Sequence, residues 1–260
     1  MKNFVLIICA VTAAYFGAAP LRAADPFESA SATPTPASIN VYDWYTLGEL
    51  ICAAANFNYN VTVYSQLDGA YKRVYEAMQK VHLSDSTISA FKEYYAQLKK
   101  LPFDKDWDAW TKQEQDIWLN SPAGTAWLKG VAQEAGKSMP TTFFYWLGRH
   151  TLSAAWVAPY YQSHGWKKDV IAVLTNVSTD CYAFATDSNY RTAFDALAPD
   201  VQKELTVMGA LAPRLKPKAD DPFASPGAAV DPISDDDIAK VVAAAKQLRA
   251  AAQDHKLLRD

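Results

Sequence analysis

The run from Met139 to Trp166 is the most apolar and aromatic stretch after the first residues of this 260-residue chain, and it constrains the fold most. Pro140 suits the first turn of a helix, where its missing N–H would have no partner. Pro159 should end or kink that helix. Bulky side chains recur every three or four residues on two faces, so we expect other helices to surround it. On one face lie Phe143, Trp146, Leu147, His150, Ala154, Val157 and Tyr161; on the other lie Tyr145, Arg149, Leu152, Trp156 and Tyr160.

A transmembrane helix is the competing interpretation, because the distance between Pro140 and Pro159 would suit a span. Arg149 and His150 sit near the midpoint of that stretch. A charged side chain at the centre of a bilayer costs at least ~2.5–3.5 kcal/mol on insertion scales. The sequence therefore favours a helix buried in protein, with no membrane span after the N-terminal segment.

The first 23 residues have the three parts of a secretory signal peptide. Lys2 supplies the positive charge, residues 4–19 form an apolar core, and Leu21-Arg22-Ala23 is a plausible cleavage site. An uncleaved membrane anchor is the alternative, although the core is short for a span. We expect a periplasmic or secreted protein.

The charge and glycine content exclude several classes of function. The whole chain has 25 basic and 28 acidic residues, a net charge of −3. Removal of the first 23 residues would take away Lys2 and Arg22, which leaves 23 basic residues and a net charge of −5. Mild acidity argues against binding to nucleic acid or to anionic lipid as the main role. The chain has only ten glycines and no GxGxxG or GxxxxGK[ST] motif, so no nucleotide cofactor is expected.

Two cysteines, Cys52 and Cys181, follow the predicted signal peptide, and each lies on the apolar stripe of a predicted helix. Such cysteines are commonly buried free thiols. An oxidising compartment also makes a disulfide between them possible, and we expect that bond. The chain has no CxxC motif for redox chemistry and no CxxCH motif for haem attachment.

The remaining patterns predict an all-α fold, an irregular bundle of about eight helices around the central aromatic-rich helix. Residues 24–39 are rich in proline, serine and alanine and should form a disordered lead to a helical domain at residues 40–212. Residues 213–233 read as a linker, followed by a C-terminal amphipathic helix at residues 234–260. The apolar stripe of that helix either folds back on the domain, which we favour, or binds a partner.

The central stretch also carries the candidate binding residues. Arg149 shares a helical face with aromatic side chains that stack well on a guanidinium or line a ligand site. The structural alternative is an arginine that bonds helix-end carbonyls or a carboxylate, and for His150 a hydrogen-bonded core histidine. The candidates for ligand binding are Tyr145, Arg149, His150, Trp156 and Tyr160.

Metal and catalytic motifs are weak. His150 and His164 would lie ~21 Å apart on a straight helix, too far to share an ion. The run from Asp104 to Asp108 resembles the front of a calcium loop, but Ala109 and Gln115 stand where glycine and glutamate are needed. No GxSxG, SxxK or HExxH motif occurs, so we expect no metal and no cofactor, and the catalytic residues, if any, are unknown.

These observations predict an exported helical binding or accessory protein that uses aromatic-lined helix faces for a protein partner or a small ligand. Two alternatives stay open. The first is an envelope hydrolase with His150 or a carboxylate as acid/base. The second is a subunit of a cell-envelope complex that docks through its C-terminal helix.

Overall fold

The computed structural model describes residues 40–56, 64–103, 105, 107–215 and 233–259. The predicted signal peptide, the lead predicted to be disordered and residues 216–232 of the predicted linker lie outside these ranges. Within the described residues the chain is 82% helical and contains no strand, which confirms the predicted all-α bundle. An isolated antiparallel bridge joins Leu197 to Leu258.

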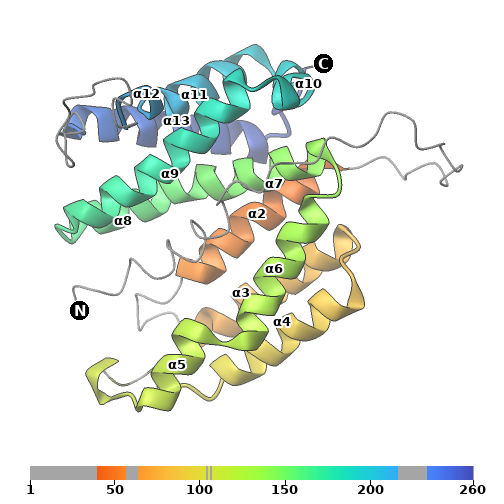
Figure 1. Cartoon of the computed structure of the whole chain (residues 1–260), viewed down its shortest axis with the longest axis vertical. Helices are drawn as coiled ribbons and strands as arrows, with labels where there is room; N and C mark the ends of the chain where they lie inside the picture. The colour runs from red at the N-terminus through yellow and green to blue at the C-terminus, as the bar shows by residue number, and fades with distance from the viewer. Residues whose placement is uncertain (1–39, 57–63, 104, 106, 216–232, 260) are drawn as a thin grey trace, which may run out of the picture.

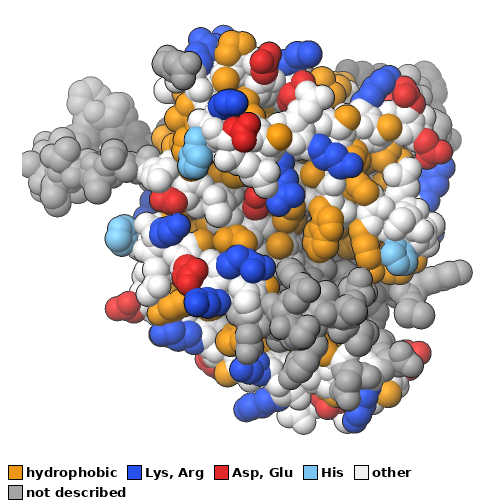
Figure 2. Space-filling view, turned by 180° about the vertical axis from the view of Figure 1, so that it is seen from behind, with side chains coloured by type: hydrophobic (Ala, Val, Ile, Leu, Met, Phe, Trp, Pro, Cys, Tyr) orange, Lys and Arg blue, Asp and Glu red, His pale blue; other side chains and the backbone are white. Residues whose placement is uncertain are grey.

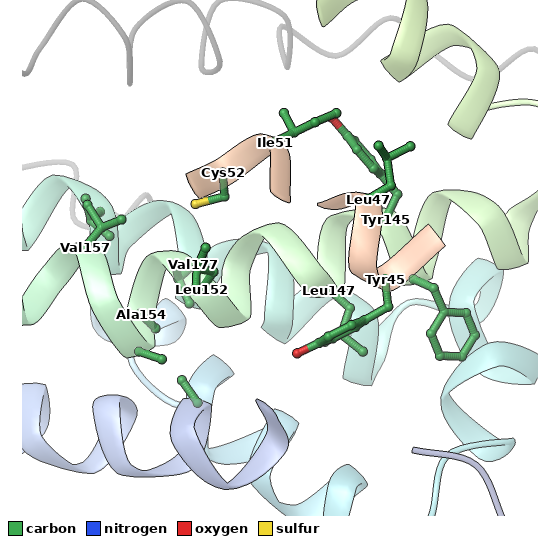
Figure 3. Close-up of a cluster of buried hydrophobic side chains, with 14 of the residues drawn as sticks. Tyr45, Leu47, Ile51, Cys52, Tyr145, Leu147, Leu152, Ala154, Val157 and Val177 are labelled. Carbon is green, nitrogen blue, oxygen red and sulfur yellow. The ribbon is translucent and has the colours of Figure 1, made fainter. Parts of the chain in front are cut away.

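Helices α2 (Val41–Asn56) and α7 (Met139–Leu152) cross at the centre of the molecule, and a pair of glycines sets their separation. A Cβ atom on Gly48 would lie 2.0 Å from the carbonyl oxygen of Tyr145, and one on Gly148 would lie 2.0 Å from that of Tyr45. The two backbones are therefore in direct contact, and the helices run in the same direction, with Cys52 near the end of α2 against Ser153 just after α7. Leu47, Ile51 and Leu147 are fully buried around this crossing (Figure 3).

The central stretch changes its helix type before Pro159. The α-helix α7 ends at Leu152, a π-helical turn, η4, covers Ser153–Val157, and α8 continues from Ala158 to Ser163. Pro159 has no N–H with which to bond the carbonyl four residues earlier, and the wider turn accommodates it. The backbone N–H of Ala158 bonds the oxygen of Ser153, five residues back. The α-helix thus ends ahead of the proline, but the chain remains helical.

Two groups of helices cover opposite sides of the α2–α7 pair (Figure 1). One group contains α9 (Lys167–Thr186), α11 (Pro199–Gly209) and α13 (Asp235–Gln253). The other contains α3 (Tyr64–Lys80), α4 (Asp85–Leu98), α5 (Lys112–Asn120) and α6 (Pro122–Ala135). The short segments are η3 (Trp107–Ala109), η5 (Ser188–Tyr190), α10 (Arg191–Asp195) and α12 (Ala212–Leu215).

Aromatic side chains fill the contacts within these groups. Trp127 of α6 is 2% exposed, and its ring lies 5.0 Å from Phe91 and 5.8 Å from Tyr94 of α4. The ring of Tyr71 on α3 stacks 4.8 Å from that of Tyr95. Large flat rings bury much area and interlock by edge and face, so they hold helices together at irregular angles. Most of the aromatic residues of the described chain are used in this way.

The C-terminal helix α13 packs against α11, η4 and α7 of the same chain. Its apolar stripe is buried, with Ile238, Val241 and Leu248 at most 3% exposed. Ser234 and Asp237 form a capping box at its start. A hydrogen bond from Arg214, assisted by bonds from Ser234, holds the pKa of Asp237 well below its usual range. The stripe therefore has its covering surface within the chain.

No helix among the described residues is long and apolar enough to cross a bilayer.

The expected disulfide between Cys52 and Cys181 is wrong. The two cysteines are free and buried, and they are not within bonding distance of each other. The Sγ of Cys52 lies 3.2 Å from the Oγ of Ser153, whereas Cys181 on α9 lies against Gly209 of α11. Each belongs to the buried stripe of a different interface, because α2 and α9 pack on different faces of the central helix. Burial raises the pKa of the Cys181 thiol, which keeps it protonated.

These two thiols should be unreactive in the folded protein. We expect a Cys9→Ser variant of the chain to take up no Ellman's reagent in native buffer and to release two thiols when it is unfolded in guanidinium. Both thiols are buried, so the reagent cannot reach them while the protein stays folded. Fewer than two thiols after unfolding without reductant would mean that a disulfide does form.

Candidate functional site

The structure divides the five candidate residues among three places along the α7–α8 stretch. Tyr145 and Arg149 lie together beside α2. His150 points away from them toward α9. Trp156 lies in the π-helical turn, and Tyr160 follows it in α8. No single aromatic-lined site is formed by all five.

Arg149 is held by aromatic residues of its own helix. Its guanidinium carbon lies 4.8 Å from the ring centre of Trp146 and 5.9 Å from that of Tyr145. Its Nη1 donates a hydrogen bond of 3.3 Å to the hydroxyl of Tyr145. Tyr145 is fully buried, so its ring offers no face to a ligand. These stacking contacts position the guanidinium at the half-buried edge of α7.

His150 pairs with a carboxylate that the sequence did not indicate. Its Nε2 lies 2.8 Å from Oδ2 of Asp180 on α9, and the two side chains are 10% and 28% exposed. The Nε2 atom is buried and has no well-directed hydrogen bond among the described residues, so the contact is a close approach rather than an aligned hydrogen bond. Asp180 lies 30 residues further along the chain, and no local pattern links it to His150.

Aromatic rings enclose this pair. The ring of Trp146 stacks on His150 at 5.9 Å, and Phe184 lies 6.3 Å away. Tyr190 of η5 packs against Phe184 at 5.0 Å, and its pKa is raised by burial and by the nearby charge of Asp180. A histidine beside a carboxylate has the chemistry of a general base. Here the imidazole nitrogen that faces the carboxylate is closed off, so a substrate has no access to it.

A surface cluster of aromatic residues forms at the turn between α8 and α9. The ring of His164 lies 4.3 Å from that of Tyr160 and 5.1 Å from that of Trp166. Gly165 adopts φ 69° and allows the chain to reverse, which returns Trp166 onto α8. Trp156 lies one helical turn before Tyr160 and is 43% exposed. We call these four residues, Trp156, Tyr160, His164 and Trp166, the aromatic turn.

The sequence named two members of the aromatic turn and missed His164 and Trp166. The signal that could have found them is the glycine between them, because a tight reversal after a helix brings the next residues back onto its last turn. Charged side chains of both signs are spread over the molecule with hydrophobic ones between them (Figure 2). The face shown there is therefore not dominated by charges of one sign.

Metal binding gains no support from the described residues, where no three potential ligands come together. The calcium-like run lies partly outside them, since Asp104 and Asp106 are not described.

Comparisons of the chain with models of known protein families, with curated proteins and with solved structures give no match.

Proposed function

We propose that the chain is an exported, non-catalytic binding or accessory protein that holds its partner or small ligand on the aromatic turn. The observation that carries this proposal is the exposure of Trp156, which keeps 43% of its surface in solvent while most other large apolar side chains described are covered. Tryptophan and tyrosine dominate the energy of binding surfaces because they bury large rigid areas and also offer a polar edge.

The enclosure of His150 supports binding over catalysis. An acid/base residue must come within hydrogen-bond reach of its substrate. The Nε2 of His150 is instead directed at Asp180 and covered by its neighbours. One observation favours the envelope hydrolase as a second candidate, namely that Asp180 keeps 28% of its side chain exposed and could serve as a base from the surface.

Photo-crosslinking tests the proposal with a matched control in the same chain. The second exposed large apolar residue among those described is Tyr182, 37% exposed, on α9. We expect benzoylphenylalanine at position 156 to give a discrete adduct in cells of the native host, and the same probe at position 182 to give none. Mass spectrometry detects either a protein or a small-molecule adduct, and it also reports whether residues 1–23 have been removed.

Two results would contradict this function. Identical adducts from positions 156 and 182 would show non-specific contact, and no adduct at position 156 would show that the aromatic turn is unoccupied. Retention of residues 1–23 would contradict the proposed export but not the proposed binding role. Loss of a hydrolytic activity in an Asp180→Asn variant would favour the second candidate.

A further inference from the structure

An open groove separates the C-terminal end of α4, the helix α5 and the first turn of α6, on the far side of the molecule's centre from α9. Its volume is about 620 Å³. Pockets that hold small ligands commonly measure ≈ 300–1,000 Å³. The groove is remote in the chain from the aromatic turn, so its role is independent of the function proposed above.

Side-chain amides provide most of the hydrogen-bonding groups of the groove. Gln97 comes from α4, and Gln113 and Asn120 come from the two ends of α5. Gln113 and Asn120 are exposed, and neither forms a side-chain hydrogen bond with a described residue. Each carboxamide offers two N–H donors and an oxygen that accepts. The groove therefore presents donors and acceptors together, ready for a ligand that has both.

The walls of the groove are fixed in place. The Oγ of Ser121 donates a hydrogen bond of 2.7 Å to Oε1 of Gln97, which ties the start of α6 to α4. Ser121 also caps α6 by accepting from the N–H of Gly124 at 3.1 Å. At the start of α5, Thr111 and Glu114 form a capping box. Fixed walls lower the entropy cost of binding.

The charge of the groove is balanced. Nζ of Lys112 lies 2.6 Å from Oδ1 of Asp116, one helical turn away on α5. Among the residues that the structure describes, these are the only ionisable ones that line the groove. An anionic ligand would require an unpaired cation and a cationic ligand an unpaired carboxylate, so the lining suits a neutral molecule. Ile117 and Pro122 add aliphatic surface between the amides.

We propose that this groove binds a neutral carbohydrate, a short chain of sugar units. Sugar hydroxyls donate and accept, which matches the carboxamides of Gln113 and Asn120. Gln97 is already bonded to Ser121 and Glu93, and it forms part of the wall. The C–H faces of a sugar ring match the aliphatic surface of Ile117 and Pro122. The balanced pair Lys112–Asp116 can bond hydroxyls without selecting for charge.

Titration of the full chain with neutral oligosaccharides tests this site. The probes are cellotetraose, maltotetraose and the tetramer of N-acetylglucosamine, followed by isothermal calorimetry. We expect at least one of them to bind with a dissociation constant of about 1 mM or tighter and with little dependence on salt. A Gln113→Ala/Asn120→Ala variant should weaken binding about tenfold or more, because two pairs of hydrogen bonds are lost.

The matched control is Gln133→Ala, which removes an exposed amide of α6 outside the groove. It should leave the affinity unchanged, and all three residues are exposed, so the variants should melt like the parent chain. Failure of every sugar to bind would overturn the assignment. So would binding of a capped, uncharged tetrapeptide in place of the sugars, or equal loss of affinity in the Gln133→Ala control.

Discussion

A Gly148→Ala variant is expected to lose about 3 kcal/mol or more of its free energy of unfolding. The new Cβ would lie 2.0 Å from the carbonyl oxygen of Tyr45, and backbone atoms cannot turn aside as a flexible side chain can. Added methyl groups in tightly packed cores cost about 1–3 kcal/mol and occasionally more, and this contact is closer than any ordinary one. Gly48→Ala should have a similar effect, since its Cβ meets Tyr145 in the same way.

Thermal and urea unfolding measure this loss. For a domain of this size we expect the melting temperature to fall by about 6–12 °C. The control is Gly69→Ala on α3, where the nearest atom to the new Cβ is Nη1 of Arg73 at 3.9 Å. That variant should gain about 0.5–1 kcal/mol, because alanine favours the helix and nothing obstructs it. Equal effects at positions 69 and 148 would mean that the α2–α7 contact is not as close as described.

Breaking the His150–Asp180 pair is expected to cost about 2 kcal/mol. Asp180→Ala leaves the imidazole Nε2 buried without its carboxylate, and an unsatisfied buried polar group costs about 1–3 kcal/mol. A His150→Phe/Asp180→Leu double variant should recover most of that loss, because an apolar pair of similar volume needs no partner there. The rings of Trp146 and Phe184 would pack against phenylalanine as they do against His150.

The control for this contact is an exposed ion pair of the same length. Nε of Arg191 lies 2.8 Å from Oδ2 of Asp195, but these side chains are 69% and 46% exposed. Exposed pairs contribute about 0–1 kcal/mol, so Asp195→Ala should change the free energy of unfolding very little. If Asp180→Ala lowers the free energy of unfolding no more than Asp195→Ala does, the contact between His150 and Asp180 does not stabilise the packing of α7 against α9.

Much of the fold followed from patterns within single helices. The periodicity from Phe143 to Tyr161 predicted a buried central helix, and Phe143, Leu147, Ala154 and Val157 are all at most 3% exposed. The amphipathic pattern predicted a C-terminal helix from residue 234, and α13 begins at Asp235 with Ser234 as its cap. These patterns can be recognised in a sequence because the hydrogen bonds and helical faces that produce them involve residues only three or four positions apart.

Features that depend on contacts between residues far apart in the chain could not be predicted from the sequence. The pairing of Cys52 with Cys181 was predicted from their number and the expected compartment, and it failed because a disulfide needs the two Cα atoms within about 7 Å. The π-helical turn at Ser153–Val157 also altered which of the candidate residues lie together. The candidate site was therefore divided by geometry that the predicted faces did not contain.

The sequence by itself determined that this chain forms helices, where most of them begin, and which side chains are buried, since these depend on local hydrogen bonding and on the period of apolar residues. Only the tertiary structure decided that Gly48 meets Gly148, that His150 faces Asp180, and that Gln97 lies across a groove from Asn120. Those pairings depend on how helices far apart in the chain pack together, and no spacing along one helix specifies the position of another.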